Sequence, residues 1–151
     1  MKVAILSGSV YGTAEEVARH AQNLLKDAGI ETFYNSRANL ADIQAFGPEA
    51  LLAVTSTTGM GELPDNLQPL YSAIRDQLPA QLLGLPGAVI ALGDASYGDT
   101  FCGGGEQMRE LFGELGVREV QEMLRIDASE SVTPETDAEP WLVQFIDALK
   151  G

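Results

Sequence analysis

The chain has 151 residues, 45% of them hydrophobic, and its 22 acidic against 9 basic side chains give a formal charge of −13. This composition predicts a single domain, residues 1–151, with a substantial core, and the charge argues against binding to nucleic acid or anionic membranes. One cysteine excludes an internal disulfide. The start MKVAILSGS has too short an apolar stretch for a signal peptide, and no apolar run approaches membrane-spanning length, so we expect a cytoplasmic protein.

The first predicted strand covers residues 3–6 and leads into SGSVYGT, which combines glycines with hydroxyl side chains. Thr13 and Glu16 have the spacing of a capping box, and apolar residues then recur at helical period, which predicts a helix packed on a sheet. A helix N-terminus beneath a glycine-containing loop attracts anions. Because no Lys or Arg lies between Val3 and Val17, a phosphate here would be held by amides and hydroxyls. The alternative is a helix cap that binds nothing.

The alternation of strand and helix continues along the chain. Further strands are expected at residues 31–34, 50–55, 86–92 and 118–126, and helices at 39–46, 66–77, 106–115 and, after an acidic loop at 127–139, from 140 onward. Asn39 is expected to cap the helix at 39–46, and Asn66 or Asp65 the helix at 66–77. Helices are expected to end at Gly29, Gly47 and Gly116. Five strands alternating with helices predict a parallel sheet covered on both faces, with right-handed crossovers. The loops after the first, third and fourth strands would then meet at the carboxyl edge of the sheet, where such sheets bind ligands.

Other nucleotide sites and catalytic sites fit the sequence poorly. The first turn lacks both the G-x-G-x-x-G pattern of dinucleotide-binding folds and the Gly-Lys-Ser/Thr ending of a P-loop. Cys102 and Arg109 are separated by six residues, one more than a thiolate phosphatase requires, so we expect Cys102 to be a small, partly buried residue. His20 is expected on the polar side of the first helix, in solvent.

The acidic residues of the second and third loops lack the His or Cys partners of a metal centre. We therefore predict no catalytic residue and no metal site, with magnesium binding left as an open alternative. The acidic residues concerned are Glu62, Asp65, Asp94 and Asp99.

Three segments, SGSVYGTAEE, TSTTGMGELPDN and ALGDASYGDTFCGGG, resemble in order and spacing the three FMN-binding loops of flavodoxins. The likeness spans nearly the whole chain, and the later stretch EMLRIDASESVTPETDAEPW is similar to small bacterial flavodoxins of the YqcA type. The resemblance implies a flavodoxin-like α/β fold: a doubly wound five-stranded parallel sheet in the order 2-1-3-4-5, with helices on both faces. It also implies the short-chain class, since the last strand has no room for a long insertion, and a non-covalently bound FMN.

The resemblance assigns FMN contacts to all three loops. Tyr97 matches the aromatic residue that stacks on the flavin ring. Many flavodoxins have a tryptophan or tyrosine on the opposite face, where this sequence has Thr58 with Met60 nearby, which implies a more open face and weaker flavin binding. The contacts implied are Ser7, Gly8, Ser9, Val10, Tyr11, Gly12, Thr13 and Ala14 in the first loop, Thr55, Ser56, Thr57, Thr58, Gly59, Met60 and Gly61 in the second, and Gly93, Asp94, Ala95, Ser96, Tyr97, Phe101 and Cys102 in the third.

The family's chemistry is one-electron transfer, so the resemblance implies a redox carrier rather than a stand-alone enzyme. Gly59 would allow the peptide that follows Thr58 to turn its carbonyl toward flavin N5 and stabilise the neutral semiquinone. The acidic loop residues and the net charge would raise the energy of the anionic hydroquinone and lower the second potential.

The same negative charge would steer basic redox proteins toward the flavin edge. We expect a monomer whose partners are a ferredoxin- or flavodoxin-NADP reductase and an unknown acceptor. Two alternatives stay open: an FMN-dependent NAD(P)H:quinone oxidoreductase, and a flavin-free acidic adaptor that only binds proteins.

Overall fold

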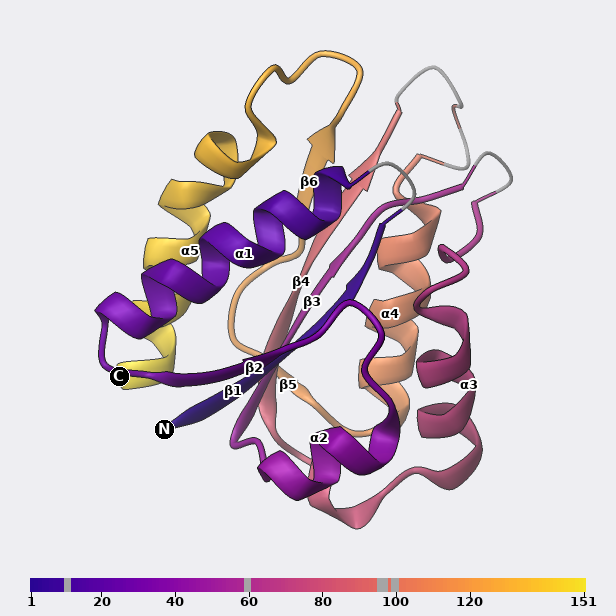
Figure 1. The fold of residues 1–151 in the computed structure, drawn as a ribbon, viewed down its shortest axis with the longest axis vertical. Helices are drawn as coiled ribbons and strands as arrows, with labels where there is room; N and C mark the ends of the chain where they lie inside the picture. The colour runs from indigo at the N-terminus through magenta and orange to yellow at the C-terminus, as the bar shows by residue number, and fades with distance from the viewer. Residues whose placement is uncertain (10–11, 59–60, 95–97, 99–100) are drawn as a thin grey trace.

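The structure, a computed structural model, describes residues 1–9, 12–58, 61–94, 98 and 101–151. It is a parallel sheet between two layers of helices (Figure 1). The strands are β1 (Lys2–Gly8), β2 (Glu31–Tyr34), β3 (Ala50–Thr55), β4 (Pro86–Gly93), β5 (Arg118–Glu119) and β6 (Leu124–Asp127). The helices are α1 (Thr13–Asp27), α2 (Leu40–Phe46), α3 (Gln68–Gln77), the 3-10 turn η1 (Ala80–Leu82), α4 (Gly103–Glu114) and α5 (Pro134–Lys150).

The sheet has the order β2-β1-β3-β4-β5, and every pair of neighbouring strands is parallel, which confirms the predicted fold and strand order. Since β1, β3 and β4 all run in the same direction, their carboxyl ends lie at one edge of the sheet (Figure 1).

The prediction of one continuous strand at residues 118–126 is wrong. Two short strands, β5 and β6, pair with the beginning and the end of β4, and only residues 120–123 connect them. In this connection the carbonyl of Glu122 accepts a hydrogen bond from Trp141 Nε1 of α5, at 2.8 Å, instead of pairing with β4. The Trp141 side chain of α5 therefore contacts the backbone where the strand is interrupted.

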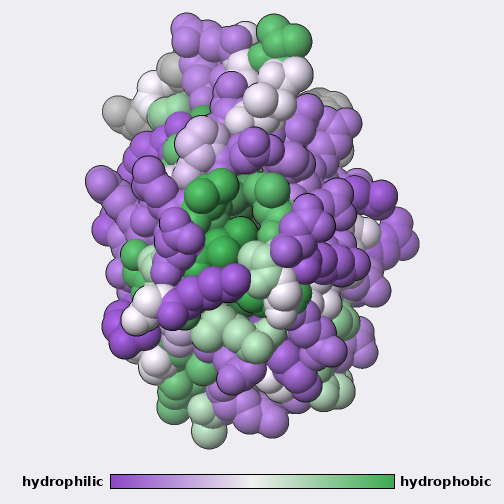
Figure 2. Space-filling view, turned by 90° about the vertical axis from the view of Figure 1, so that its left-hand side faces the viewer, coloured by the Kyte–Doolittle hydropathy of each residue, from purple (hydrophilic) through white to green (hydrophobic). Residues whose placement is uncertain are grey.

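Two hydrophobic cores lie on opposite faces of the sheet. On one face α1 and α5 pack against alternate strand residues such as Val3 and Ile5, and on the other α2, α3 and α4 pack against Ala4 and Leu6. Both faces are covered, which explains why the central strands are continuously apolar. The outer surface on the α1 and α5 side is mostly hydrophilic, with an apolar area at its centre (Figure 2).

Several predicted helix ends are confirmed and others are corrected. Asn39 caps α2 by accepting a hydrogen bond from Asp42 N at 2.9 Å, as predicted. The predicted capping box of α1 does not form: Gly12, with φ of 86°, is the N-cap, and Thr13 is already helical. The prediction that Asn66 or its neighbour caps α3 is also wrong, because Leu67 occupies the N-cap position.

Helix α5 begins earlier than predicted. It starts at Pro134, in the middle of the predicted acidic loop, because a proline in the first turn loses no helical hydrogen bond. Pro140, predicted near the start of the helix, instead lies inside it, where its missing N–H removes one helical bond. Within the described ranges, no helix combines the length and apolarity needed to cross a membrane.

Candidate functional site

The loops that follow β1, β3 and β4 are joined to one another at the carboxyl edge of the sheet. Ser56 N donates to the carbonyl of Gly8 at 2.9 Å, which connects the ends of β3 and β1. Gly104 N, at the start of α4, donates to Thr57 Oγ1 at 3.0 Å, which connects the third loop to the second. The predicted convergence of these three segments at one place is confirmed.

The first loop leaves the N-terminus of α1 uncapped. Ser9 Oγ accepts a hydrogen bond from Gly12 N at 2.7 Å, and the first helical bond runs from Glu16 N to the carbonyl of Gly12 at 3.0 Å. No side chain in the described part of the chain caps the first turn. The backbone N–H groups of residues 13–15 therefore have the positive potential of a helix N-terminus, which suits an anion.

Gly8 has a packing role that the sequence did not reveal. A Cβ atom at this position would lie 2.8 Å from Leu67 Cβ and 3.0 Å from Thr55 Oγ1. The end of β1 therefore approaches the start of α3 more closely than any residue with a side chain would allow. This close approach brings the first loop against the segment that leads into α3.

Asn66 is a site residue that sequence reasoning missed. Its Oδ1 accepts a hydrogen bond from Ser9 N at 3.0 Å, while its Nδ2 donates to the carbonyl of Ser36 at 2.9 Å. An amide side chain can donate and accept at once, so Asn66 connects the loop after β1 to the loop after β2. The sequence alone indicated Asn66 only as a candidate helix cap.

A polar cavity of about 220 Å³ lies beside the first loop, on the β2 side. Its wall includes Arg37, a cation that lies outside the first loop in the sequence. It also includes Tyr34, whose buried hydroxyl has no hydrogen-bond partner among the described residues. Burial raises the pKa of this hydroxyl. The residues that line the cavity are Ser7, Ser9, Gly12, Glu15, Tyr34, Ser36, Arg37 and Asn66.

In the second loop, backbone hydrogen bonds join the described residues Thr58, Gly61 and Glu62. Gly61 N donates to the carbonyl of Thr58 at 2.9 Å, and Thr58 N donates to the carbonyl of Glu62, also at 2.9 Å. The Thr58 hydroxyl donates to the same Glu62 carbonyl at 3.3 Å. Gly61 has φ of 83°, a left-handed conformation that favours glycine.

A family model described as flavodoxin matches residues 5–141. The chain belongs to the flavodoxin family. An uncharacterized protein of Pseudomonas aeruginosa is 78% identical over all of both chains, and Flavodoxin YqcA of Pectobacterium carotovorum is 40% identical over 98% of this chain and 97% of its own. The solved structure of a cysteine-to-alanine variant of a Pseudomonas aeruginosa flavodoxin has a TM-score of 0.96 and 77% identity, with all of both chains covered.

Some of the contacts that the flavodoxin resemblance implied fall outside the described residues. The predicted stacking of Tyr97 and the predicted freedom of the Gly59 peptide therefore stay predictions. The site residues concerned are Val10, Tyr11, Gly59, Met60, Ala95, Ser96 and Tyr97, and Asp99 of the acidic loop residues is also among them.

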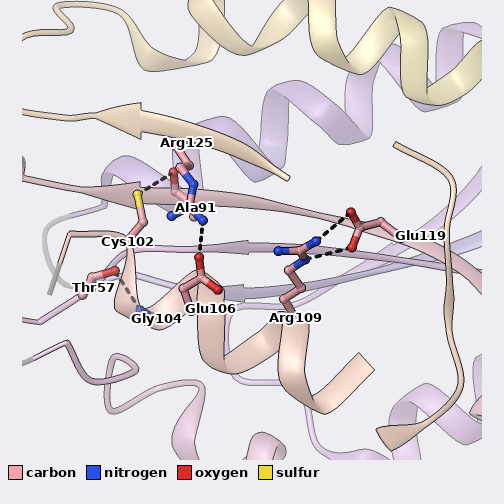
Figure 3. A network of polar contacts seen from close by, with 8 residues as sticks. All are labelled: Thr57, Ala91, Cys102, Gly104, Glu106, Arg109, Glu119 and Arg125. Carbon is pink, nitrogen blue, oxygen red and sulfur yellow. Dashed lines mark hydrogen bonds and ion pairs between the residues drawn. The ribbon is translucent and has the colours of Figure 1, made fainter. Parts of the chain in front are cut away.

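Cys102, in the third flavodoxin loop, is fully buried, and its Sγ donates to the carbonyl of Ala91 at 3.6 Å (Figure 3). Burial raises the pKa of the thiol to about 11, so it is protonated at neutral pH. Arg109 points away from it and pairs with Glu119, at 2.9 Å (Figure 3). The pair that a thiolate phosphatase would need does not form.

Cys102 also shapes the backbone where β4 meets α4. It is the N-cap of α4, with a left-handed φ of 59°. A Cβ atom at Gly93 would lie 2.6 Å from Cys102 N, so only glycine allows this approach. Phe101, before it, is partly buried and packs against the core on the α3 and α4 side.

His20 lies on the polar side of α1, as predicted, but it is only partly exposed and has a side-chain partner. Its Nε2 lies 2.8 Å from Glu139 Oε1, in a contact between α1 and α5. This pair lies on the helical layer rather than in the loops, which leaves His20 outside the candidate site. No group of three or more metal-binding side chains occurs within the described ranges.

Proposed function

We propose that the protein binds one FMN and carries single electrons, at low potential, between a reductase and acceptor proteins. One observation carries this proposal: three loops from separate strands are bonded together at one edge of the sheet, beside an uncapped helix N-terminus. Flavodoxin family proteins bind FMN and act in electron transfer, which supports the same assignment.

The first loop fits the phosphate group of FMN. The amides at the start of α1 and the hydroxyls of Ser9 and Thr13 provide donors, and the glycine at the N-cap leaves room for close approach. Glu15 lies in the first turn of α1, but its carboxylate is paired with Arg19 at 2.6 Å, which offsets its repulsion of an anion. Arg37, from the loop after β2, adds a positive charge on the far side of the loop.

The flavin ring would lie between the second and third loops. The described residues there include Thr57 and Thr58 on one side, and Gly93, Asp94 and Gly98 on the other. When bound, FMN would supply the one-electron chemistry. The chain would hold the ring, and the net charge of −13 would oppose the formation of a negative charge on the flavin.

Acidic surface charge also suits transient docking of a basic reductase and a basic acceptor. We propose that the protein works as a monomer in the cytoplasm with such partners. An FMN-dependent NAD(P)H:quinone oxidoreductase and a flavin-free acidic adaptor are the competing functions.

Titration of FMN with the purified flavin-free protein tests the proposal. Quenching of flavin fluorescence at a 1:1 endpoint, followed by reduction through a reductase but not by NAD(P)H alone, is the expected result. Absence of quenching would favour the adaptor, whereas direct turnover of NAD(P)H would favour the oxidoreductase.

A further inference from the structure

The loop between β6 and α5, residues 128–133, adjoins the start of the third loop. Asp127, the last residue of β6, is the register partner of Gly93, the last residue of β4. Ala128 N then donates to the carbonyl of Gly93 at 2.7 Å. The loop therefore lies at the same edge of the sheet as the ends of β1, β3 and β4 (Figure 1). The flavodoxin resemblance assigned no FMN contact to it.

Hydrogen bonds connect this loop to the elements on both sides of it. The carbonyl of Asp127 accepts from Ser131 N at 3.1 Å, and Asp127 Oδ1 accepts from Ser129 N at 3.0 Å. On the other side, Ser131 Oγ donates to Asp137 Oδ2 in the first turn of α5. The backbone that presents Val132 is thus held by both β6 and α5.

Val132 directs an apolar side chain into solvent at this edge. Its relative exposure is 95%, whereas each of the other exposed large hydrophobic residues in the described ranges is less than half exposed. Within the part of the chain that the structure describes, Val132 belongs to neither hydrophobic core. Burial of a valine side chain against a partner is strongly favourable, so this residue suits an intermolecular contact.

The charges around Val132 indicate the kind of partner. Glu130 and Asp137 are exposed, and among the described residues neither is paired with a Lys or Arg. Arg125, on the neighbouring strand β6, is already paired with Glu106. A second copy of a chain of charge −13 would be repelled, whereas a basic protein would be attracted. An apolar side chain within a charged rim is also the common composition of a protein interface.

We propose that residues 128–133 form part of the docking surface for a basic redox protein, with Val132 as the apolar anchor. This inference rests on the proposed function. The partner would provide an apolar pocket for Val132, surrounded by Lys or Arg side chains that face Glu130 and Asp137. The loop would contact the partner and not FMN, so substitutions in it should separate docking from flavin binding.

Val132→Ser and Glu130→Gln test the apolar and the charged parts of this surface. With FMN-loaded protein and a basic ferredoxin-type NADP reductase, Val132→Ser should raise the KM for the protein about tenfold and leave kcat unchanged. The increase should persist at 0.5 M ionic strength, because salt does not screen an apolar contact. Glu130→Gln should raise KM severalfold at low ionic strength only. FMN affinity and both midpoint potentials should match the wild type in each variant.

Val143→Ser and Glu114→Gln are the matched controls. Val143 is 46% exposed further along α5, and Glu114 is an exposed residue at the far end of α4 from the third loop. Both variants should have the KM of the wild type. Analytical ultracentrifugation tests a second copy as the occupant, and the wild type and Val132→Ser should both sediment as monomers.

The outcomes separate this inference from the proposed function. Wild-type protein that binds no FMN, or accepts no electrons from the reductase, overturns both. Wild-type transfer with an unchanged KM in Val132→Ser overturns only the docking role. The same conclusion follows if Val143→Ser raises KM equally, or if the wild type forms a dimer that Val132→Ser abolishes. Thermal melting monitors folding, and Val132→Thr, which keeps the shape of the side chain, takes the place of Val132→Ser if that variant does not fold.

Discussion

Asn66 Oδ1 lies 3.0 Å from Ser9 N, so a residue just before α3 holds the loop that follows β1. The two residues are 57 positions apart in the chain. The other end of the same amide holds the carbonyl of Ser36. The conformation of the candidate phosphate loop thus depends on a side chain from outside that loop.

Replacement of Asn66 should therefore weaken FMN binding. Asn66→Ala removes two partly buried hydrogen bonds, and we expect a loss of about 2 kcal/mol in stability and about tenfold in FMN affinity. Fluorescence titration and urea denaturation measure the two effects. Asn39→Ala is the control: it removes the cap of α2, should cost about 1 kcal/mol, and should leave FMN affinity unchanged. Equal affinities for the two variants would contradict the role of Asn66.

Gly8→Ala should destabilise the fold. Its added Cβ would meet Leu67 Cβ at 2.8 Å, and overpacking of this kind costs about 1–3 kcal/mol. Gly113→Ala is the opposite case, because among the described residues nothing beyond the neighbouring backbone of α4 itself lies within 4 Å of the added atom. That variant should gain about 0.5–1 kcal/mol from the better helix propensity of alanine. Urea denaturation measures the free energy of unfolding of both variants. If Gly8→Ala left that free energy unchanged, β1 and α3 could separate without loss of stability.

Stability should fall at alkaline pH because of Cys102. The folded protein keeps the thiol protonated up to a pKa of about 11, while the unfolded chain releases the proton near 9.0. The folded state therefore binds more protons in this range, and the free energy of unfolding decreases as pH rises. At pH 10.5 the loss is about 2 kcal/mol relative to pH 8.

Cys102→Ala separates this effect from the titration of other groups. Urea denaturation at pH 8 and pH 10.5 should show a smaller alkaline loss for the variant than for the wild type. Identical losses would mean that the thiol ionises equally easily in the folded and unfolded chains.

Electron transfer to and from the proposed partners should depend on salt. With a basic ferredoxin-type NADP reductase, the rate should fall severalfold between low and 0.5 M ionic strength, because screening weakens attraction to a chain of charge −13. Stopped-flow absorbance of the FMN-loaded protein gives the rate. Dithionite, an anionic reductant, is the control and should react faster as salt is added. A reductase rate that is indifferent to salt would contradict electrostatic steering.

Local sequence patterns were sufficient to predict most of the fold. Gly29, Gly47 and Gly116 follow helices in the sequence and have the left-handed φ values expected there. The apolar strands and their alternation with helices predicted a parallel sheet covered on both faces, and the three loops at one edge of it. The strand order 2-1-3-4-5 was implied by the resemblance to flavodoxins.

The remaining features depend on contacts between distant residues. The break between β5 and β6 involves Trp141 of α5, and Asn66 serves a loop 57 positions earlier. Arg37 reaches the candidate site from the neighbouring strand's loop. Periodicity and capping rules describe only neighbours in the chain, so they could not reveal these three contacts.

The bond between Thr57 Oγ1 and Gly104 N has a consequence for the order of folding. It joins residues 47 positions apart, and it gives the first turn of α4 an acceptor that the helix's own N-cap residue does not provide. This turn gains its partner only after β3 and β4 have come together. The rest of α4 can form earlier, so Thr57→Ala should speed unfolding while leaving the refolding rate almost unchanged.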